Sequence, residues 1–202
     1  MSPFILLIAG RTCSGKTFLA NHLMNHHGFQ RVITYTSRTP RPGEVNGVDY
    51  HFKSEEEFEA LINQGQFIEH VQRLDAATNR QAYYGSSLQH CLTQKQQFVM
   101  VIDPDGVRDS LEYLKKHGHP HCAVFLDTPE SVCVDRLKER PSDPSETAQR
   151  LHDLTHIERE WHKAAAYNVI VTGADCLDIE NLSHQLSRRT KKHDKSPLTP
   201  QP

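Results

Sequence analysis

A short stretch near the N-terminus has the residue types and the spacing that bind phosphate. Residues 10–17 read Gly-Arg-Thr-Cys-Ser-Gly-Lys-Thr and match the pattern G-x-x-x-x-G-K-[ST]. In such a loop the backbone N–H groups curl around an anion, the lysine reaches the β- and γ-phosphates, and the last hydroxyl can ligate Mg²⁺. The stretch therefore predicts a nucleoside triphosphate site with Lys16 on the phosphates and Thr17 near the metal.

The segments on either side of this loop support that interpretation. Residues 4–9 form an uninterrupted apolar run, as a buried parallel strand does, and residues 16–26 carry apolar side chains at helical spacing. A helix that follows such a loop points its N-terminal N–H groups at a bound anion. A chance glycine-rich turn would not require this order of strand, loop and helix, so we favour the phosphate loop.

A second candidate site lies in a segment rich in proline, glycine and arginine, from residue 35 to about residue 53. Arg38 and Arg41 lie beside prolines, and each guanidinium offers paired donors that suit a phosphate. Tyr50 and Tyr84 add hydroxyl donors for the same anion. Taken alone, two arginines beside prolines also fit an exposed, solvated turn, so both interpretations stay open at this point.

The rest of the chain alternates apolar runs with segments of helical periodicity. The expected strands are residues 4–9, 29–34, 67–71, 98–103, 122–126 and 167–172. The expected helices are residues 16–26, one from Ser54 to about Gly65, residues 87–93 and 106–116, one from Pro129, one from Ser145 through Trp161, and residues 177–188. Strands of this kind alternating with helices predict an α/β fold with a mainly parallel sheet covered on both faces.

Composition limits the class of protein. A chain of 202 residues is long enough for one α/β core with an inserted subdomain. The formal net charge of -2 gives no general basic field, so neither nucleic acid nor a membrane surface is expected as a partner. The five cysteines are scattered without a C-x-x-C pair, which indicates neither a disulfide framework nor a zinc site and suits a reducing, cytoplasmic setting. The short apolar run at the N-terminus predicts a core strand and not a signal segment.

Residues 36–52 carry a longer and more specific pattern. They read Thr-Ser-Arg-Thr-Pro-Arg-Pro-Gly-Glu-Val-Asn-Gly-Val-Asp-Tyr-His-Phe and resemble the guanylate kinase signature T-[ST]-R-x-P-R-x-G-E-x-x-G-x-D-Y-x-F. Phe-Ile-Glu at residues 67–69 and Tyr-Tyr-Gly-Ser at residues 83–86 match the next two blocks of that family in order. The resemblance extends from about residue 4 to residue 185.

The resemblance implies a P-loop kinase fold: a mainly parallel central sheet flanked by helices, an inserted mixed GMP-binding subdomain and a short helical lid. The guanylate kinase-like domain would span residues 1–188. Its core would be residues 1–34, 88–135 and 165–188, its GMP-binding subdomain residues 35–87, and its lid residues 136–164. Residues 189–202 have nothing to bury and are expected to form a disordered tail.

The resemblance also implies a reaction, the transfer of the γ-phosphoryl group of ATP to GMP with Mg²⁺ as cofactor. The partners would be these nucleotides, and the chain a monomer or homodimer. The implied catalytic residues are Lys16, Asp103, Arg140 and Arg150. The implied ATP-binding residues are Gly10, Thr12, Cys13, Ser14, Gly15, Lys16, Thr17, Arg136 and Thr172, with Thr17 on Mg²⁺ through ATP. The implied GMP-binding residues are Thr34, Arg38, Arg41, Tyr50, Glu69, Tyr84, Ser86 and Asp103.

The implied role of Glu69 agrees with its chemistry. A carboxylate can accept hydrogen bonds from both the N1–H and the exocyclic amine of guanine, a pair of donors that adenine does not offer. Two acids on the long helix, Glu158 and Glu160, fit a solvated helix face better than a catalytic role.

Several residues depart from the family pattern. Cys13 stands where the family has a glycine, Val101 replaces an acid, Pro141 replaces a glycine of the lid, and Thr172 replaces an asparagine. The stretch between Glu69 and Tyr83 is longer than usual, and residues 73–82 are expected to form a loop. Two alternatives therefore stay open: a related P-loop kinase for another phosphorylated acceptor such as a ribose bisphosphate, and a catalytically impaired guanylate-kinase-like binding domain.

Overall fold

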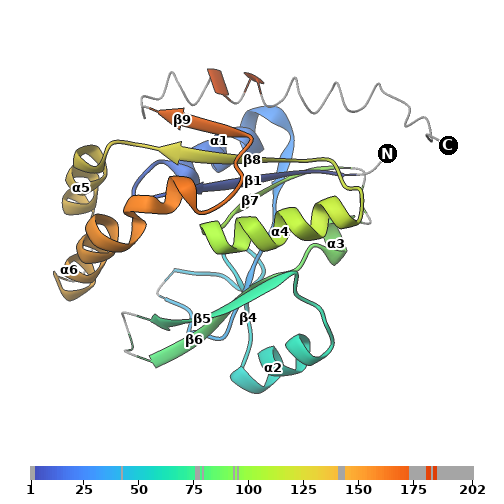
Figure 1. The fold of residues 1–202 in the computed structure, drawn as a ribbon. Helices are drawn as coiled ribbons and strands as arrows, with labels where there is room; N and C mark the ends of the chain where they lie inside the picture. Colours follow the sequence, from blue (N-terminus) through green and yellow to red (C-terminus); the bar gives the residue numbers. More distant parts are fainter. Residues whose placement is uncertain are drawn as a thin grey trace.

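A parallel sheet forms the centre of the molecule (Figure 1). The computed structural model describes residues 3–41, 43–75, 78, 80–92, 94, 96–140, 144–172, 181–182 and 184–185. Within this part of the chain the central sheet has five strands in the order β2-β7-β1-β8-β9, and every pair is parallel. The strands are β1 (Phe4–Gly10), β2 (Phe29–Arg31), β7 (Gln97–Val101), β8 (His121–Asp127) and β9 (Val169–Thr172).

The central strand β1 is buried along its whole length, and its side chains alternate between the two faces of the sheet. Leu6 and Ile8 pack in one cluster with Leu19 and Leu23 of α1 (Lys16–His27). Ile5 and Leu7 pack in a second cluster with Val107 and Leu111 of α4 (Pro104–Lys116). The helices thus cover opposite faces of the sheet, which confirms the α/β fold expected from the continuous apolar runs.

A second, mixed sheet lies below the first in the view of Figure 1. Its described strands have the order β4-β3-β6-β5, with bounds Tyr35–Thr36 for β3, His51–Phe52 for β4, Glu69–Asp75 for β5 and Arg80–Ser86 for β6. The helix α2 (Glu55–Asn63) packs on it through the buried Phe58, which stacks on Phe67 and Tyr83. A Cβ atom at Gly85 would lie 2.9 Å from the Phe58 ring, so glycine is required where β6 crosses this helix.

The expectation of a loop at residues 73–82 is wrong. Arg73–Asp75 extend β5 and Arg80–Ala82 begin β6, and the two strands pair from Glu69↔Ser86 out to Asp75↔Arg80. Alternation was hidden in the sequence because polar and charged residues occupy both faces of this hairpin.

The segment after β8 is helical but not regular. It consists of α5 (Glu130–Glu139), α6 (Pro144–His152), a π-helical turn η1 (Asp153–Ile157) and a 3₁₀ segment η2 (Glu158–Lys163). The single long helix expected through Trp161 is therefore wrong, since the helical register changes after His152. In Figure 1, α5 and α6 lie side by side beyond the ends of β8 and β9.

Most other boundaries expected from the sequence are confirmed within a few residues. Gly28 ends α1 in the left-handed conformation, with φ 70°, and Ser54 with Glu57 forms the capping box of α2. The strand β2 ends at Arg31 instead of Thr34, the strand expected at residues 67–71 is β5, and the helix expected at 87–93 is the short α3 (Gln89–Leu92). Of the last expected helix, residues 181–182 and 184–185 are helical, and the others lie outside the described residues, as do Pro141 and the tail at 189–202.

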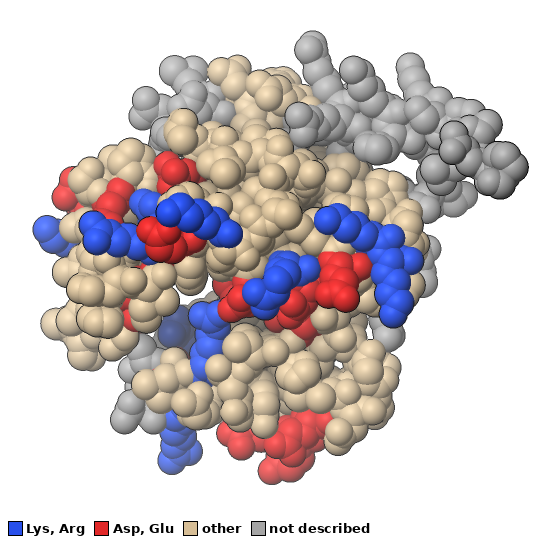
Figure 2. Space-filling view, in the orientation of Figure 1, with Lys and Arg blue, Asp and Glu red and all other residues tan. Residues whose placement is uncertain are grey.

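The surface carries charges of both signs. Lys and Arg side chains lie among Asp and Glu side chains on the face shown in Figure 2. Arg108 of α4, for example, pairs with Asp105 of the same helix. Acidic side chains gather over α2, which carries Glu55, Glu56 and Glu57 in its first turn. None of the described helices has the length and apolar character of a membrane span.

Candidate functional site

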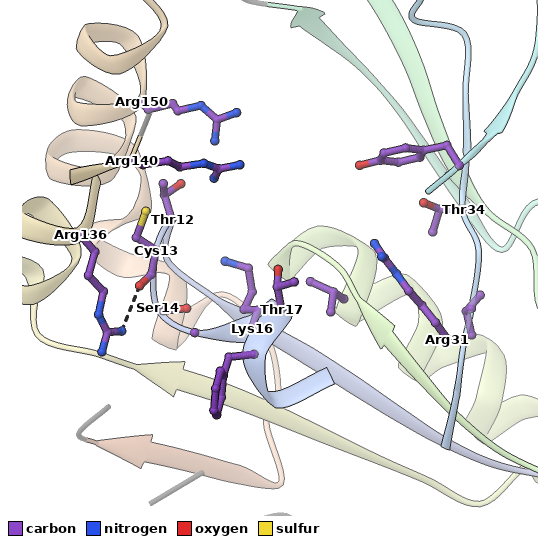
Figure 3. Close-up of a pocket in the computed structure, with 15 residues that line it drawn as sticks. Thr12, Cys13, Ser14, Lys16, Thr17, Arg31, Thr34, Arg136, Arg140 and Arg150 are labelled. Carbon is purple, nitrogen blue, oxygen red and sulfur yellow. Dashed lines mark hydrogen bonds between the residues drawn. The ribbon is translucent and has the colours of Figure 1, made fainter. Parts of the chain in front are cut away.

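A cavity of about 730 Å³ opens where the phosphate loop, the helical segment after β8 and the residues beside β3 and β4 meet (Figure 3). The predicted site residues that line it are Thr12, Cys13, Ser14, Gly15, Lys16, Thr17, Thr34, Tyr50, Arg136, Arg140 and Arg150. Phe18, Arg31, Val32 and Val101 complete the lining. Two residues predicted on the GMP side, Thr34 and Tyr50, therefore share one space with residues predicted on the ATP side. The lining does not include the other residues predicted on the GMP side, which are Arg38, Arg41, Glu69, Tyr84, Ser86 and Asp103.

The loop from Gly10 to Gly15 has the backbone that anion binding requires. Gly10 has φ 155° and Gly15 φ 102°, and a Cβ at Gly10 would lie 2.8 Å from the Leu126 carbonyl oxygen. Cys13, with φ 61°, is the described non-glycine residue in the left-handed region, so this chain keeps a glycine-like backbone without the glycine. No described side chain caps α1, whose N-terminal N–H groups begin directly at the cavity.

Lys16 folds back over the loop. Its Nζ donates to the carbonyl oxygens of Gly10 at 2.7 Å and Arg11 at 2.6 Å, and the side chain points into the cavity (Figure 3). Burial lowers the pKa of Lys16, and the nearby charge of Glu158 opposes that shift. Arg140 at the end of α5 and Arg150 of α6 extend into the same space, so that together with Lys16 three cationic groups converge on one region of the cavity.

Glu158 holds the outer edge of the phosphate loop. Its Oε2 accepts from the Thr12 backbone N–H at 2.5 Å and its Oε1 accepts from Thr12 Oγ1 at 2.8 Å. Only 5% of Glu158 is exposed, so the expectation of a solvated face is wrong for this residue. The same expectation is confirmed for Glu160, whose side chain is 70% exposed and pairs with Lys163. The π-helical turn before Glu158 changes the register, and the sequence carries no signal for that turn.

Arg136 approaches the loop from α5. Its Nη1 donates to the Cys13 carbonyl oxygen at 3.3 Å, which is the dashed line in Figure 3. The side chain thereby braces the non-glycine position of the loop. Thr172, also predicted to bind ATP, lies at the end of β9, where it pairs with Asp127 of β8, and it does not line the cavity.

The two arginines of the signature segment are ordered by carboxylates. Arg38 is 6% exposed, and its Nη1 and Nη2 donate to the two oxygens of Glu44 at 2.7 and 2.6 Å. Its guanidinium carbon lies 5.0 Å from the centre of the Tyr50 ring, and the hydrogen bonds to Glu44 raise the pKa of Arg38 further. The exposed-turn interpretation is therefore wrong for Arg38, because its guanidinium is buried, paired and fixed.

Arg41 lies between two acids from distant segments. Its Nη2 is 3.4 Å from Oδ1 of Asp75 in β5 and 3.6 Å from Oε1 of Glu146 in α6. The same Glu146 oxygen accepts from Arg150 Nη2 at 2.7 Å. One carboxylate thus connects an arginine predicted to bind the acceptor phosphate with an arginine predicted to act from the lid.

Glu69 and Ser86 face each other across the β5–β6 pair, where Ser86 Oγ donates to Glu69 Oε1 at 2.5 Å. Burial raises the pKa of Glu69 to about 7, and the charges of Asp103 and Asp109 act in the same direction. Tyr84 lies on the same face of the sheet opposite Val71, and burial raises its pKa as well. An acid and hydroxyl groups on one face of the sheet can form hydrogen bonds with the polar edge of a bound base.

Asp103 lies at the N-cap of α4 and not in the lining of the cavity. Its Oδ1 accepts from the Gly106 N–H at 2.8 Å, and its Oδ2 pairs with Arg73 Nη2 of β5. The described residues form no group of three or more His, Cys, Asp or Glu that could hold a metal ion. A metal at this site would therefore depend on oxygens of a bound nucleotide together with the Thr17 hydroxyl.

Comparison with known proteins identifies the family. The sequence model described as guanylate kinase matches residues 2–192. The chain belongs to the guanylate kinase family. It is 30% identical over 193 residues to a guanylate kinase of Rickettsia bellii, covering 93% of this chain and 95% of that protein. It is 33% identical over 185 residues to one of Neisseria meningitidis serogroup A, covering 87% and 82%.

A solved structure agrees with the fold. The crystal structure of guanylate kinase from Anaplasma phagocytophilum superimposes with a TM-score of 0.65 at 21% identity, covering 96% of this chain and 88% of that one. These findings confirm the family resemblance and the P-loop kinase fold predicted from the signature segment. Guanylate kinases are ATP-dependent nucleoside monophosphate kinases, and this chain takes its place among them.

Proposed function

We propose that the chain transfers the γ-phosphoryl group of ATP to GMP, giving GDP and ADP, as a cytoplasmic enzyme. The observation that carries the proposal is one cavity lined both by the phosphate loop and by Thr34, just before β3, and Tyr50 of the signature segment. Phosphoryl transfer in line between two nucleotides requires both to occupy one continuous space. The family membership supports the same reaction.

On the ATP side, the chain supplies positioning and positive charge. Backbone N–H groups of the loop and of the α1 N-terminus bind the phosphates, with Lys16 on the β/γ oxygens. Arg140 and Arg150 neutralise charge that spreads over the transferring phosphoryl group, and Arg136 lies nearer the adenine. Bound Mg²⁺ would neutralise phosphate charge, with the Thr17 hydroxyl as its protein ligand. No general base is needed, since the acceptor is already a phosphate oxygen.

On the GMP side, most of the phosphate-binding and base-reading groups come from the second sheet, from the segment that joins β3 to β4, and from Thr34 just before β3. Arg38, Arg41, Tyr50 and Tyr84 bind the GMP phosphate, and the prior ordering of Arg38 by Glu44 lowers the entropy lost on binding. The groups that read guanine are Thr34, Glu69 and Ser86, with Asp103 acting from the start of α4. Residues 35–87 would thus be the GMP-binding subdomain and residues 136–164 the lid.

The activity is tested by coupled measurement of ADP release with GMP, dGMP, AMP, UMP and ribose 1,5-bisphosphate as acceptors. The proposal expects turnover that depends on GMP and exceeds turnover with AMP and UMP. Turnover with the ribose bisphosphate alone would identify a different acceptor class. GMP that binds without any turnover would identify a binding domain and overturn the enzyme assignment.

Glu69→Gln is expected to lower kcat/KM for GMP about 10- to 100-fold. The amide keeps one acceptor but brings a donor toward the guanine N–H groups, and a hydrogen bond to a charged group contributes about 1.5–3 kcal/mol. Glu55→Gln, an exposed acid at the start of α2, is the matched control for the change in charge. An unchanged KM for GMP in Glu69→Gln would count against its role in reading guanine.

The rate with GMP should depend on the ionisation of Glu69. Its pKa is raised to about 7 because burial disfavours the charge, and only the carboxylate accepts two N–H donors. The value of kcat/KM for GMP is therefore expected to rise between about pH 6 and about pH 8, with a midpoint near 7.

The same raised pKa means that the folded chain without nucleotide binds a proton more tightly than the unfolded chain. Its contribution to stability consequently falls as pH increases toward 7. The assignment of Glu69 to guanine would be contradicted if wild-type protein showed no such rise in kcat/KM, or if Glu69→Gln still showed the rise.

A further inference from the structure

The β5–β6 hairpin continues past Glu69 and Ser86 and places further charged side chains on the same face. Side chains alternate along a strand, so Glu69, Val71, Arg73 and Asp75 of β5 share one face of the sheet. That is the face on which Glu69 meets Ser86 and on which Tyr84 lies. The added length of the hairpin therefore extends the proposed acceptor site.

Arg73 connects this face to the first turn of α4. Its Nη2 pairs with Oδ2 of Asp103, while Oδ1 of Asp103 accepts from the Gly106 N–H at 2.8 Å. Both oxygens of Asp103 are thus engaged, one with the hairpin and one with the helix. The Asp103 side chain is 21% exposed and the Arg73 side chain 44%, so the carboxylate is partly desolvated while solvent on the Arg73 side still screens the ion pair.

Asp75 provides a second contact of the hairpin with the acceptor site. It is 4% exposed, and its Oδ1 accepts from Arg41 Nη2 at 3.4 Å while its Oδ2 accepts from Thr78 Oγ1 at 2.9 Å. The hairpin therefore contacts Asp103, which we assign to the guanine base, and Arg41, which we assign to the GMP phosphate. A segment with two such contacts is positioned to influence acceptor choice.

We propose that Arg73 is a positioning residue that sets the preference for the acceptor base, through its ion pair with Asp103 beside Glu69. This inference rests on the proposed function, because it assigns Glu69 to a guanine edge. It adds a residue that the signature segment does not contain and gives the extended hairpin a role.

The charges around Glu69 give the physical reason. Asp103 and Asp109, both on the α4 side, disfavour its negative charge, whereas the Ser86 hydroxyl and the guanidinium of Arg73 favour it. Loss of Arg73 would leave Asp103 without its partner from β5 and would raise the pKa of Glu69 further above its ordinary value. A neutral carboxyl group then predominates at neutral pH and accepts from only one of two N–H donors.

The acceptor base reports this change directly. Guanine offers both N1–H and an exocyclic amine, whereas hypoxanthine offers N1–H alone. An ionised Glu69 gains from the second donor, so it favours GMP over IMP, and a neutral Glu69 loses much of that preference. The ratio of kcat/KM for GMP to that for IMP is therefore a measure of what Arg73 contributes.

The test compares Arg73→Met, which keeps the length of the side chain without its charge, with Arg73→Lys, which keeps the charge. Arg73→Met is expected to move the midpoint of the pH profile for GMP upward by about half a unit to one unit. It should also lower the GMP/IMP ratio at pH 7 about 3- to 10-fold, with KM for ATP unchanged. Arg73→Lys should retain most of both properties. Lys53→Met, which removes a charge that pairs with Glu57, is the control and should leave both unchanged.

Two outcomes are kept distinct. If wild-type protein turns over GMP and Arg73→Met folds with an unchanged midpoint and an unchanged GMP/IMP ratio, the role of Arg73 is overturned. If wild-type protein does not turn over GMP, the proposed function fails. Calorimetric binding of GMP and IMP across the same pH range then decides on Arg73, and equal pH dependence in wild type and Arg73→Met would overturn it.

Discussion

Lys16→Ala is expected to lower kcat by about 10²- to 10³-fold, the loss typical when one preorganised donor to a developing charge is removed. Lys16 is held in the cavity by the carbonyl oxygens of Gly10 and Arg11, so its ammonium group needs little reorganisation to reach a phosphate. The loss should appear mainly in kcat, because charge on the transferring group grows in the transition state. Steady-state ADP release with GMP as acceptor measures it.

Lys163→Ala is the matched control for Lys16→Ala. Lys163 is 67% exposed and pairs with Glu160, so its removal takes away the same charge at a residue that does not line the cavity. GMP binding to Lys16→Ala should persist, because the groups assigned to GMP lie on the second sheet, beside its strands β3 and β4, or at the start of α4, and not in the phosphate loop. Near-normal kcat in a folded Lys16→Ala variant would exclude the assigned role of the loop.

The features that were predictable from the sequence are local ones. The phosphate loop is a contiguous stretch between an apolar run and a helix, and the capping box of α2 requires only Ser54 and Glu57. The signature segment was equally readable, because its arginines and glycines lie within residues 36–52. Short patterns of this kind determine their local backbone conformation, and the phosphate loop and the capping box lie between the elements where the sequence predicts them.

The features that were missed depend on pairs of residues far apart in the chain. The extended hairpin carries polar side chains on both faces, and the buried Asp75 contacts Arg41, which lies 34 residues away in the chain. The pairing of Arg73 with Asp103 likewise spans 30 residues. Charged residues are expected to be exposed when only the sequence is known, and only the fold shows which of them pair with a charged group elsewhere in the chain.

Glu158 shows the same limit more sharply, because a change of helix type decides its position. In a regular α-helix each residue turns by about 100°, so one extra residue in a π-helical turn redirects every side chain that follows. The turn from Asp153 to Ile157 thereby sends Glu158 toward Thr12, while Glu160 remains on the surface. Residues two positions apart on a helix lie about 200° apart, on nearly opposite faces, and periodicity alone does not say which of the two acids faces the phosphate loop.

Glu158→Ala is accordingly expected to weaken the phosphate loop specifically. The change leaves the Thr12 N–H and hydroxyl without their carboxylate in a buried place, which should lower the free energy of unfolding by about 2–3 kcal/mol. It also removes the negative charge that opposes the lowering of the Lys16 pKa. Because the loop binds ATP, KM for ATP should rise about 10-fold while KM for GMP changes little.

Urea unfolding and the two KM values measure these effects, with Glu160→Ala as the control that removes an exposed acid from the same 3₁₀ segment. Glu158→Gln retains one carbonyl acceptor for the Thr12 N–H and should fall between wild type and Glu158→Ala in both measurements. Parallel increases in the two KM values would indicate a general loss of structure in place of a loop-specific effect. If Glu158→Ala matches Glu160→Ala in both stability and KM for ATP, the carboxylate does not hold the loop, and the π-helical turn has no part in forming the ATP site.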